Sequence, residues 1–345
     1  MSNFSPSDVV LKIEGLVTSF RTDDGVVTAL EGVSFEISRG KTLGIVGESG
    51  CGKSVTSLSI MRLLPNGVGK IEAGKVIFDG KDLVTLPESE MRDLRGNRIA
   101  MIFQEPMTAL NPVFTAGEQI IEVFMTHRHM SRAEARKAAL EMMEMVRIPD
   151  PDRRLDEYPH QMSGGMKQRV MIAMALACKP AVIIADEPTT ALDVTIQSQI
   201  LRLMQDLQKQ TGTSIAFITH DLGVIAEVAD EVVVMYAGKV IEKADVTAIF
   251  DRPLHPYTKG LLASIPHAGQ SRDSKLPTIK GSVPSLKDLP AGCRFFGRCP
   301  YRQTRCEKEN PTLMYEESTH GVACHFFADI AANKIKANYD GLGGE

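Results

Sequence analysis

Apolar segments alternate with stretches of helical periodicity through most of the chain. Aliphatic residues predict four buried strands, at Thr42–Val46, Val182–Ala185, Ser214–Thr219 and Glu231–Met235. Between the second and the third, apolar residues recur from Ile196 to Leu207 at the spacing of one helix face, and Gly212 marks the end of that helix. Buried strands separated by helices favour a parallel sheet covered by helices, which defines an α/β fold.

Two regions depart from this alternation. The first forty residues predict a small antiparallel sheet, because Val9–Gly15, Leu16–Arg21 and Ala29–Ile37 have the composition of short strands. Residues from about 107 to 160 have a helical pattern instead, and Ser131 with Glu134 forms the capping-box sequence of a helix start. We therefore expect a flanking antiparallel β-subdomain and a helical insert subdomain.

The character of the chain changes again after residue 245, where Pro, Gly and Cys become more frequent and the periodicity weakens. We predict a first domain at 1–245 and a smaller second domain at 246–345. The length of 345 residues agrees with roughly two domains of ordinary size.

Residues 47–54 match the pattern G-x-x-x-x-G-K-[ST] between a predicted strand and a predicted helix. Glycines let successive backbone N–H groups face phosphates, and the helix N-terminus adds positive potential. Lys53 would reach the β- and γ-phosphates, and the Ser54 hydroxyl would bind Mg²⁺. The alternative is a glycine-rich turn without a ligand, which the flanking strand and helix disfavour. The predicted phosphate-binding residues are Gly47, Glu48, Ser49, Gly50, Cys51, Gly52, Lys53 and Ser54.

A second apolar strand ends in two carboxylates, Asp186 and Glu187. Ligands of parallel sheets bind at the carboxyl ends of the strands, so we expect these acids at the phosphate site. Asp186 is suited to hold Mg²⁺ through water, and Glu187 could polarise an attacking water. Taken alone, two solvated carboxylates at a strand end would explain this pattern as well.

Together these residues resemble the ATP-binding cassette (ABC) ATPases, a branch of the P-loop NTPases. Further family motifs follow in order. They are Phe20 as the adenine-stacking aromatic, Gln104 in F-Q-E-P as the Q-loop, Ser163, Gly164 and Gly165 in the signature loop, Ala191-Leu192-Asp193 as the D-loop, and His220 in I-T-H-D as the switch histidine.

The resemblance implies a role for each motif. Ser163, Gly164 and Gly165 would meet the γ-phosphate of ATP bound by a partner subunit, and Asp193 would lie at the nucleotide. Gln104 would sense and ligate Mg²⁺, and His220 would orient the water beside Glu187. For His220 alone an ordinary surface or core histidine is the competing interpretation, and for Phe20 a core aromatic.

The C-terminal part narrows the resemblance to one family of importers. The segment H-P-Y-T-K-G-L-L at His255–Leu262 and the cysteine-containing segment after Gly292 are similar to the extension of dipeptide, oligopeptide and nickel importer ATPases. The similarity then extends over essentially the full length of the chain.

Four of the six cysteines, namely Cys293, Cys299, Cys306 and Cys324, fall close together in this extension. Their C-x5-C-x6-C-x17-C spacing indicates a four-thiolate site without naming the metal, since C-x2-C pairs are more common for zinc. The resemblance implies a [4Fe–4S] cluster, with zinc as one alternative and free or disulfide-paired cysteines as another. We expect a structural metal, supported by the basic residues Lys287, Arg294, Arg298, Arg302, Arg305 and Lys308.

Charge and hydropathy exclude other classes of function. The chain has 39 basic and 43 acidic residues, a net charge of −4, which argues against a general attraction to nucleic acid. Its longest apolar run, Val170–Cys178, is far shorter than the ~20 residues of a spanning helix. The first residues lack a basic and apolar signal peptide, so we expect a protein of the cytosol.

The resemblance thus predicts an ATP-hydrolysing motor subunit of a bacterial importer for di- and oligopeptides. It would lie peripherally on the cytoplasmic face of the inner membrane. Its partners would be two transmembrane permease subunits, a homologous second ATPase (a heterodimer in preference to a homodimer) and an extracytoplasmic peptide-binding protein. The alternatives are an importer for nickel or another small solute and a soluble ABC ATPase that acts on nucleic acid.

Overall fold

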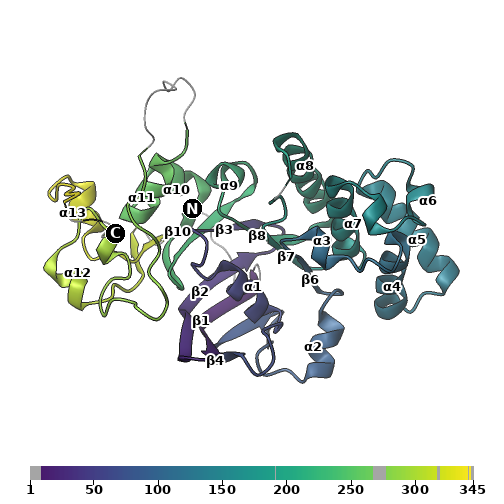
Figure 1. Ribbon diagram of the computed structural model, residues 1–345, viewed down its shortest axis with the longest axis horizontal. Helices are drawn as coiled ribbons and strands as arrows, with labels where there is room; N and C mark the ends of the chain where they lie inside the picture. Colours follow the sequence, from purple (N-terminus) through teal and green to yellow (C-terminus); the bar gives the residue numbers. More distant parts are fainter. Residues whose placement is uncertain (1–8, 191, 267–276, 317–318, 341, 343–345) are drawn as a thin grey trace. The chain divides into compact units, whose positions relative to one another are not determined.

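The computed structural model describes residues 9–190, 192–266, 277–316, 319–340 and 342 (Figure 1). The chain divides into two compact units that alternate along the sequence. Unit 1 contains the described residues up to 12 together with 36–42 and 77–218, and unit 2 contains 13–35, 43–76 and the described residues from 219 onward.

Unit 1 contains three parallel strands, β6 (Ile99–Ile102), β7 (Val182–Asp186) and β8 (Ser214–Thr219). Strand β7 lies between the other two, with Ile183 opposite both Ala100 and Ile215. Every side chain of β7 and β8 is buried, as expected for parallel strands covered on both faces. The two strands predicted here from aliphatic runs are therefore confirmed.

Helix α8 (Val194–Thr211) follows β7 and confirms the predicted amphipathic helix. The Asp193 side chain caps its first turn by accepting a hydrogen bond from the Ile196 backbone N–H at 3.0 Å. Gly212 ends the helix in the left-handed region, at φ 70°, where glycine carries no Cβ penalty. The buried face of α8 consists of Ile200, Leu201, Leu203, Met204 and Leu207.

The other helices of unit 1 lie mainly between β6 and β7 in the sequence. The Ser131 side chain accepts from the Glu134 N–H, and the Glu134 carboxylate accepts from the Ser131 N–H, so the predicted capping box is confirmed. In Figure 1, α4 to α7 lie together. The elements are α2 (Glu88–Leu94), α3 (Pro106–Ala109), α4 (Ala116–Arg128), α5 (Arg132–Met145), α6 (Pro151–Arg154), the 3₁₀ helix Pro159–Gln161 and α7 (Gly164–Leu176).

Unit 2 contains the strand order β11-β12-β10-β9-β3. Strand β3 (Thr42–Val46) is parallel to β9 (Glu231–Tyr236), which continues antiparallel into β10 (Lys239–Asp245). Two short C-terminal strands, β12 (His320–Val322) and β11 (Met314–Glu316), extend this sheet. Residues close to the C-terminus therefore belong to the same sheet as the predicted strand Thr42–Val46.

The N-terminal strands differ from the prediction in one respect. Strand β1 is continuous over Val9–Thr22, whereas the sequence predicts a break after Gly15. Gly15 has φ 59°, and its N–H donates to the Ser34 hydroxyl at 2.8 Å, so the glycine makes a local irregularity without turning the chain. In unit 2 the strand order is β2-β1-β4, with β2 at Gly25–Ser38 and β4 at Gly69–Phe78, and in unit 1 the end of β4 pairs with β5 (Lys81–Asp82).

An aromatic cluster forms the core of the C-terminal part of unit 2. Tyr236, Tyr257 and Phe295 meet edge to face, with ring centroids 4.7 to 5.5 Å apart. The helices of unit 2 are α1 (Lys53–Ile60), α9 (Leu222–Val228), α10 (Val246–Asp251), α11 (Pro256–Ala263), the 3₁₀ helix Phe296–Arg298, α12 (Thr304–Lys308) and α13 (Phe327–Ala331). Within the described ranges, no helix is both long enough and apolar enough to cross a membrane.

Candidate active site

The loop at 47–54 connects β3 to α1 in unit 2, and its glycines explain its path. Gly47, Gly50 and Gly52 all have positive φ angles, of 156°, 78° and 105°. A Cβ atom on Gly47 would lie 2.3 Å from the Met235 carbonyl oxygen, so only glycine fits at this position. The loop therefore takes a backbone course that side chains would obstruct.

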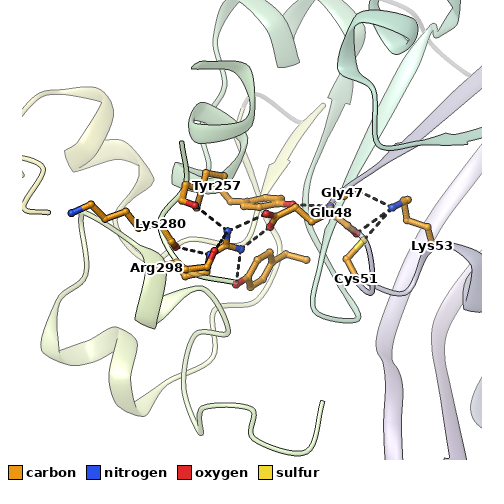
Figure 2. A network of polar contacts seen from close by, with 10 residues as sticks. Gly47, Glu48, Cys51, Lys53, Tyr257, Lys280 and Arg298 are labelled. Atoms are coloured by element: carbon orange, nitrogen blue, oxygen red, sulfur yellow. Dashed lines mark hydrogen bonds and ion pairs between the residues drawn. The ribbon is translucent and has the colours of Figure 1, made fainter. Parts of the chain in front are cut away.

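Lys53 curls back over this loop. Its side chain is buried, and its Nζ donates to the carbonyl oxygens of Gly47 at 2.7 Å and Glu48 at 3.2 Å (Figure 2). The two carbonyls hold the positive charge of Lys53 at the start of the loop. At this position the charge would attract an anionic ligand of the loop. Ser49 and Gly50 are exposed, and Ser54 is half-buried in the first turn of α1.

Cys51 packs into the interior of unit 2 although it belongs to the same loop. It is fully buried, and burial raises the pKa of its thiol. Its backbone carbonyl accepts from the Gly238 N–H at 2.8 Å, which ties the loop to the turn after β9. Cys51 thus anchors the loop from the side that faces the core.

Phe20 and His220 also belong to unit 2. Phe20 is half-buried in β1, and a Cβ on Gly69 would come within 3.1 Å of its ring, so the ring lies against a bare stretch of backbone. His220 is exposed directly after β8, ahead of Asp221, whose side chain caps α9. The exposure of His220 disfavours the interpretation as a core histidine. The adenine-stacking role of Phe20 stays a prediction.

In unit 1 the structure brings Gln104 and Glu187 together. The Gln104 amide Nε2 donates to Glu187 Oε2 at 3.0 Å, and the Thr190 hydroxyl donates to the same oxygen at 2.9 Å. Two donors from different segments therefore fix the orientation of the carboxylate. Sequence reasoning missed Thr190, although its place three residues after an acid is a spacing at which a side chain can return to that acid.

The backbone of Glu187 is held in an unusual conformation. Its φ angle is 47°, in the left-handed region that residues other than glycine rarely adopt. Its N–H donates to the Ile218 carbonyl at 2.9 Å, one residue beyond the buried Asp186 that ends β7. Strain of this kind persists only where surrounding contacts enforce it, and it concentrates at functional positions.

The signature segment forms the start of helix α7. The Ser163 side chain caps the helix by accepting from the Met166 N–H, and Ser163 and Gly164 are exposed. A Cβ on Gly165 would lie 2.8 Å from Ile196, so this glycine lets α7 approach α8 closely. The result is an open helix N-terminus with the positive potential that suits a phosphate. In the D-loop, Asp193 is exposed and Ala191 lies outside the described residues.

The predicted Mg²⁺ ligands match the preference of this ion. Ser54, Asp186 and Gln104 offer a hydroxyl, a carboxylate and an amide, all of them hard oxygen donors. Ser54 belongs to unit 2 and the other two residues to unit 1. When bound with ATP, the ion would neutralise phosphate charge.

The prediction of a metal site at the C-terminal cysteines is wrong. Cys293, Cys299, Cys306 and Cys324 are free thiols around one cavity of about 20 Å³ that aromatic rings also line. Yet among the described residues no group of three or more His, Cys, Asp or Glu side chains could hold a metal ion. Neither the [4Fe–4S] cluster nor the zinc alternative is supported.

The chemistry of these thiols gives a physical reason. Burial raises the pKa of Cys293 to about 11 and that of Cys324 to about 12, and it also raises the pKa of Cys299. Metals bind the thiolate, so a metal at these cysteines would first have to displace protons from thiols that burial keeps neutral. The cavity has room for about one water molecule.

Five of the six basic residues near these cysteines interact with other groups. Lys287 pairs with Asp24, Arg294 with Glu31, and Arg305 with Glu309. Arg302 donates to the Asp340 carbonyl, and Arg298 pairs with Glu48. Their charge is therefore matched by carboxylates and carbonyls, which removes the electrostatic argument for an anionic cluster.

Comparison with known proteins assigns the chain to a family. Residues 30–190 match the ABC transporter family, and residues 241–306 match the oligopeptide/dipeptide transporter C-terminal region. A relative in Sinorhizobium fredii, named "Probable peptide ABC transporter ATP-binding protein", is 55% identical over 94% of this chain and 97% of its own length. The dipeptide transport ATP-binding protein of Bacillus subtilis is 52% identical over 91% of this chain and 94% of its own.

A solved structure has the same fold. It is a dimeric, post-hydrolysis state of an ATP-binding cassette bound to ADP and Pi, 30% identical, with a TM-score of 0.62 over 68% of this chain and 98% of that one. Three observations lead to one assignment: a glycine-rich loop to which Lys53 donates, a carboxylate that accepts from Gln104, and more than 50% identity to a relative over nearly the full length. The chain belongs to the ATP-binding cassette ATPases and carries the C-terminal region of oligopeptide and dipeptide transporters.

Proposed function

We propose that this chain is the ATP-hydrolysing motor subunit of a bacterial importer for dipeptides and oligopeptides. The observation that carries the proposal is the transporter C-terminal region at 241–306, which follows an ABC cassette in the same chain. The names of relatives that are similar over most of their length support peptides as the cargo in preference to nickel or nucleic acid. The division into domains at 1–245 and 246–345 belongs to this proposal.

The proposed chemistry assigns each group a task on ATP. Lys53 and the backbone of its loop bind the phosphates, while Ser54, Asp186 and Gln104 hold Mg²⁺. Glu187 polarises the attacking water, and the hydrogen bonds from Gln104 and Thr190 keep its carboxylate aimed. His220 orients that water, and Phe20 stacks on adenine. Ser163, Gly164, Gly165 and Asp193 act on the ATP of a second subunit.

The proposed assembly joins the chain to other proteins at the cytoplasmic face of the inner membrane. Two permease subunits form the channel, a homologous second ATPase completes a heterodimer, and a binding protein outside the membrane delivers the peptide. ATP binding closes the two ATPases, closure drives the permeases, and hydrolysis resets them. Nucleic acid has no part in this assembly.

A groove on the helical part of unit 1 offers a surface for a permease. It has a volume of about 340 Å³, and we name it the α4 groove. Apolar side chains are unusually exposed here, with Phe114 at 49% and Met125 at 40%, and the neighbouring Val113 at 70%. The groove is lined by Phe114, Glu118, Gln119, Ile121, Glu122, Met125, Thr126 and Arg132.

Glu187→Gln tests the proposed catalytic step. The amide keeps the size of the side chain but is a far weaker base, so we expect the assembled transporter to lose ATP hydrolysis by roughly 100-fold or more. ATP affinity, measured by equilibrium dialysis, should persist because Glu187 is not assigned to phosphate binding. Glu141→Gln, an exposed carboxylate on α5, is the matched control. Hydrolysis at the wild-type rate in E187Q would remove Glu187 as the catalytic carboxylate.

A further inference from the structure

The C-terminal region of unit 2 holds one residue of the phosphate-binding loop from two directions. Arg298 forms a bidentate ion pair with the Glu48 carboxylate, with Nη1–Oε2 at 2.6 Å and Nη2–Oε1 at 3.0 Å. Tyr257 accepts a hydrogen bond from the Glu48 backbone N–H at 2.9 Å. Figure 2 shows both side chains converging on Glu48, next to Gly47, Cys51 and Lys53.

Several contacts besides Glu48 hold the Arg298 side chain in this position. Its side chain is only 6% exposed, and its guanidinium lies over the Tyr236 ring. Nε donates to the Lys280 carbonyl at 3.0 Å, Nη2 to the Gly281 carbonyl at 3.1 Å and Nη1 to the Tyr236 hydroxyl at 3.4 Å. With the two bonds to Glu48, all five N–H donors of a guanidinium have acceptors. A lysine could not reproduce this fork.

Glu48 is an unfavourable residue for a loop that binds a triphosphate. Its carboxylate is the negative group of the loop, and its backbone carbonyl lies 3.2 Å from Lys53 Nζ. Because Arg298 neutralises this carboxylate, the positive charge of Lys53 remains available to the phosphates of a ligand. Left unpaired, a carboxylate in this loop would repel a bound phosphate, because charges interact more strongly outside bulk water than in it.

We propose that Arg298 and Tyr257 are positioning residues for ATP, through which the C-terminal region sets the affinity of the phosphate-binding loop. Arg298 neutralises the Glu48 carboxylate, and Tyr257 fixes the backbone of the loop by accepting a hydrogen bond from the Glu48 N–H. The proposal rests on the proposed role of this loop in binding ATP. It gives the C-terminal region a task at the nucleotide site that needs no metal.

The test is a double-mutant cycle on the full chain, with the dissociation constant of radiolabelled ATP measured by equilibrium dialysis. We expect Arg298→Ala to weaken ATP binding at least tenfold. In a Glu48→Gln background the same substitution should change the constant by less than twofold, because no unpaired carboxylate remains. Rising salt should shrink the defect of R298A, since screening weakens charge repulsion. An equal loss in both backgrounds would mean that Arg298 only supports the fold, and would overturn the proposal.

Two further variants keep the test decisive. Arg305→Ala removes an arginine of the same segment whose side chain is 55% exposed, and it should leave ATP affinity unchanged. If R298A does not fold, Arg298→Lys retains the charge without the fork and should bind ATP more weakly than wild type, and wild-type affinity in R298K would count against the proposal. Lys53→Ala distinguishes failure of the proposed ATP site from failure of the positioning role of Arg298. Wild-type ATP affinity in K53A would refute the loop as the ATP site, whereas loss in K53A with no effect of R298A would refute only the positioning role.

Discussion

Single residues in this chain carry constraints that only their neighbours explain. Glu187 adopts a left-handed backbone while two donors hold its carboxylate, and no local sequence rule predicts that conformation for a glutamate. The motif order still identified Glu187 as the candidate base. The cysteines show the opposite case. Their spacing predicts a shared metal site, whereas the described residues contain no group of three or more His, Cys, Asp or Glu side chains that could hold a metal ion.

His255 is a residue whose burial leads to a prediction about pH. It caps α11, with Nδ1 accepting from the Tyr257 N–H at 3.0 Å, and burial lowers its pKa to about 4. Nearby Glu242 accepts from the backbone N–H groups of Leu254 and His255 and from His320 Nε2. Burial tends to raise the pKa of Glu242, but these hydrogen bonds lower it below its usual range.

Acid should therefore destabilise the fold through His255. In the unfolded chain its pKa returns to about 6.5, so between pH 6.5 and 4 the unfolded state binds more protons and the free energy of unfolding falls. At pH 4.5 the loss is about 2–3 kcal/mol relative to pH 7. His255→Asn keeps an N-cap acceptor that cannot titrate, and its free energy of unfolding should fall by that much less.

Guanidinium unfolding followed by circular dichroism at pH 7 and pH 4.5 measures this difference. The control is His129→Asn, at an exposed residue with φ 53°, a conformation that asparagine accepts. An identical drop in wild type and H255N would show that the buried histidine does not contribute to the acid sensitivity.

Whole elements could be predicted where they carry a complete local signal. The strand Thr42–Val46 and the capping box of α5 are present as expected, because aliphatic runs and S-x-x-E sequences act over a few residues. Helix α4 has the same signal in Thr115 and Glu118, and it could have been found in the same way. Strand β6, with four residues, is too short for periodicity to detect.

The start of α4 requires a glycine because a segment distant in the sequence packs against it. The Gly117 N–H donates to the Leu155 carbonyl at 2.8 Å, and a Cβ on Gly117 would lie 2.5 Å from that oxygen. Gly117→Ala should therefore destabilise the protein by about 1–3 kcal/mol through overpacking, although alanine is the better helix former by about 1 kcal/mol. Chemical denaturation measures the change. Gly297→Ala, where a Cβ has open space, is the control, and a G117A variant as stable as wild type would contradict this account.

At the scale of the whole molecule, the decisive contacts join distant parts of the sequence. Glu48 and Arg298 are 250 positions apart, and no motif links them. The cysteines are the neighbours of Arg298 along the chain, so the sequence predicts that its charge supports a metal site there. Folding instead places its guanidinium at Glu48 in the loop at 47–54, a pairing that only the three-dimensional arrangement of unit 2 reveals.

A motor subunit must transmit its cycle to another chain, and the α4 groove is the surface we expect to do so. Apolar side chains as exposed as Phe114 and Met125 gain free energy when a partner covers them. Phe114→Asp would place a charge in that contact, so tagged F114D should retain at least tenfold less permease than wild type in pull-downs from detergent-solubilised membranes.

The control for this experiment is Met145→Asp, which changes an exposed apolar side chain at the end of α5, outside the groove. Circular dichroism and ATP binding of the purified variants would report that both are folded. Because Phe114 is itself half-exposed, its replacement costs the isolated subunit little, and a loss of permease would reflect docking. Full recovery of permease with F114D, or an equal loss with M145D, would place the coupling surface elsewhere on the subunit.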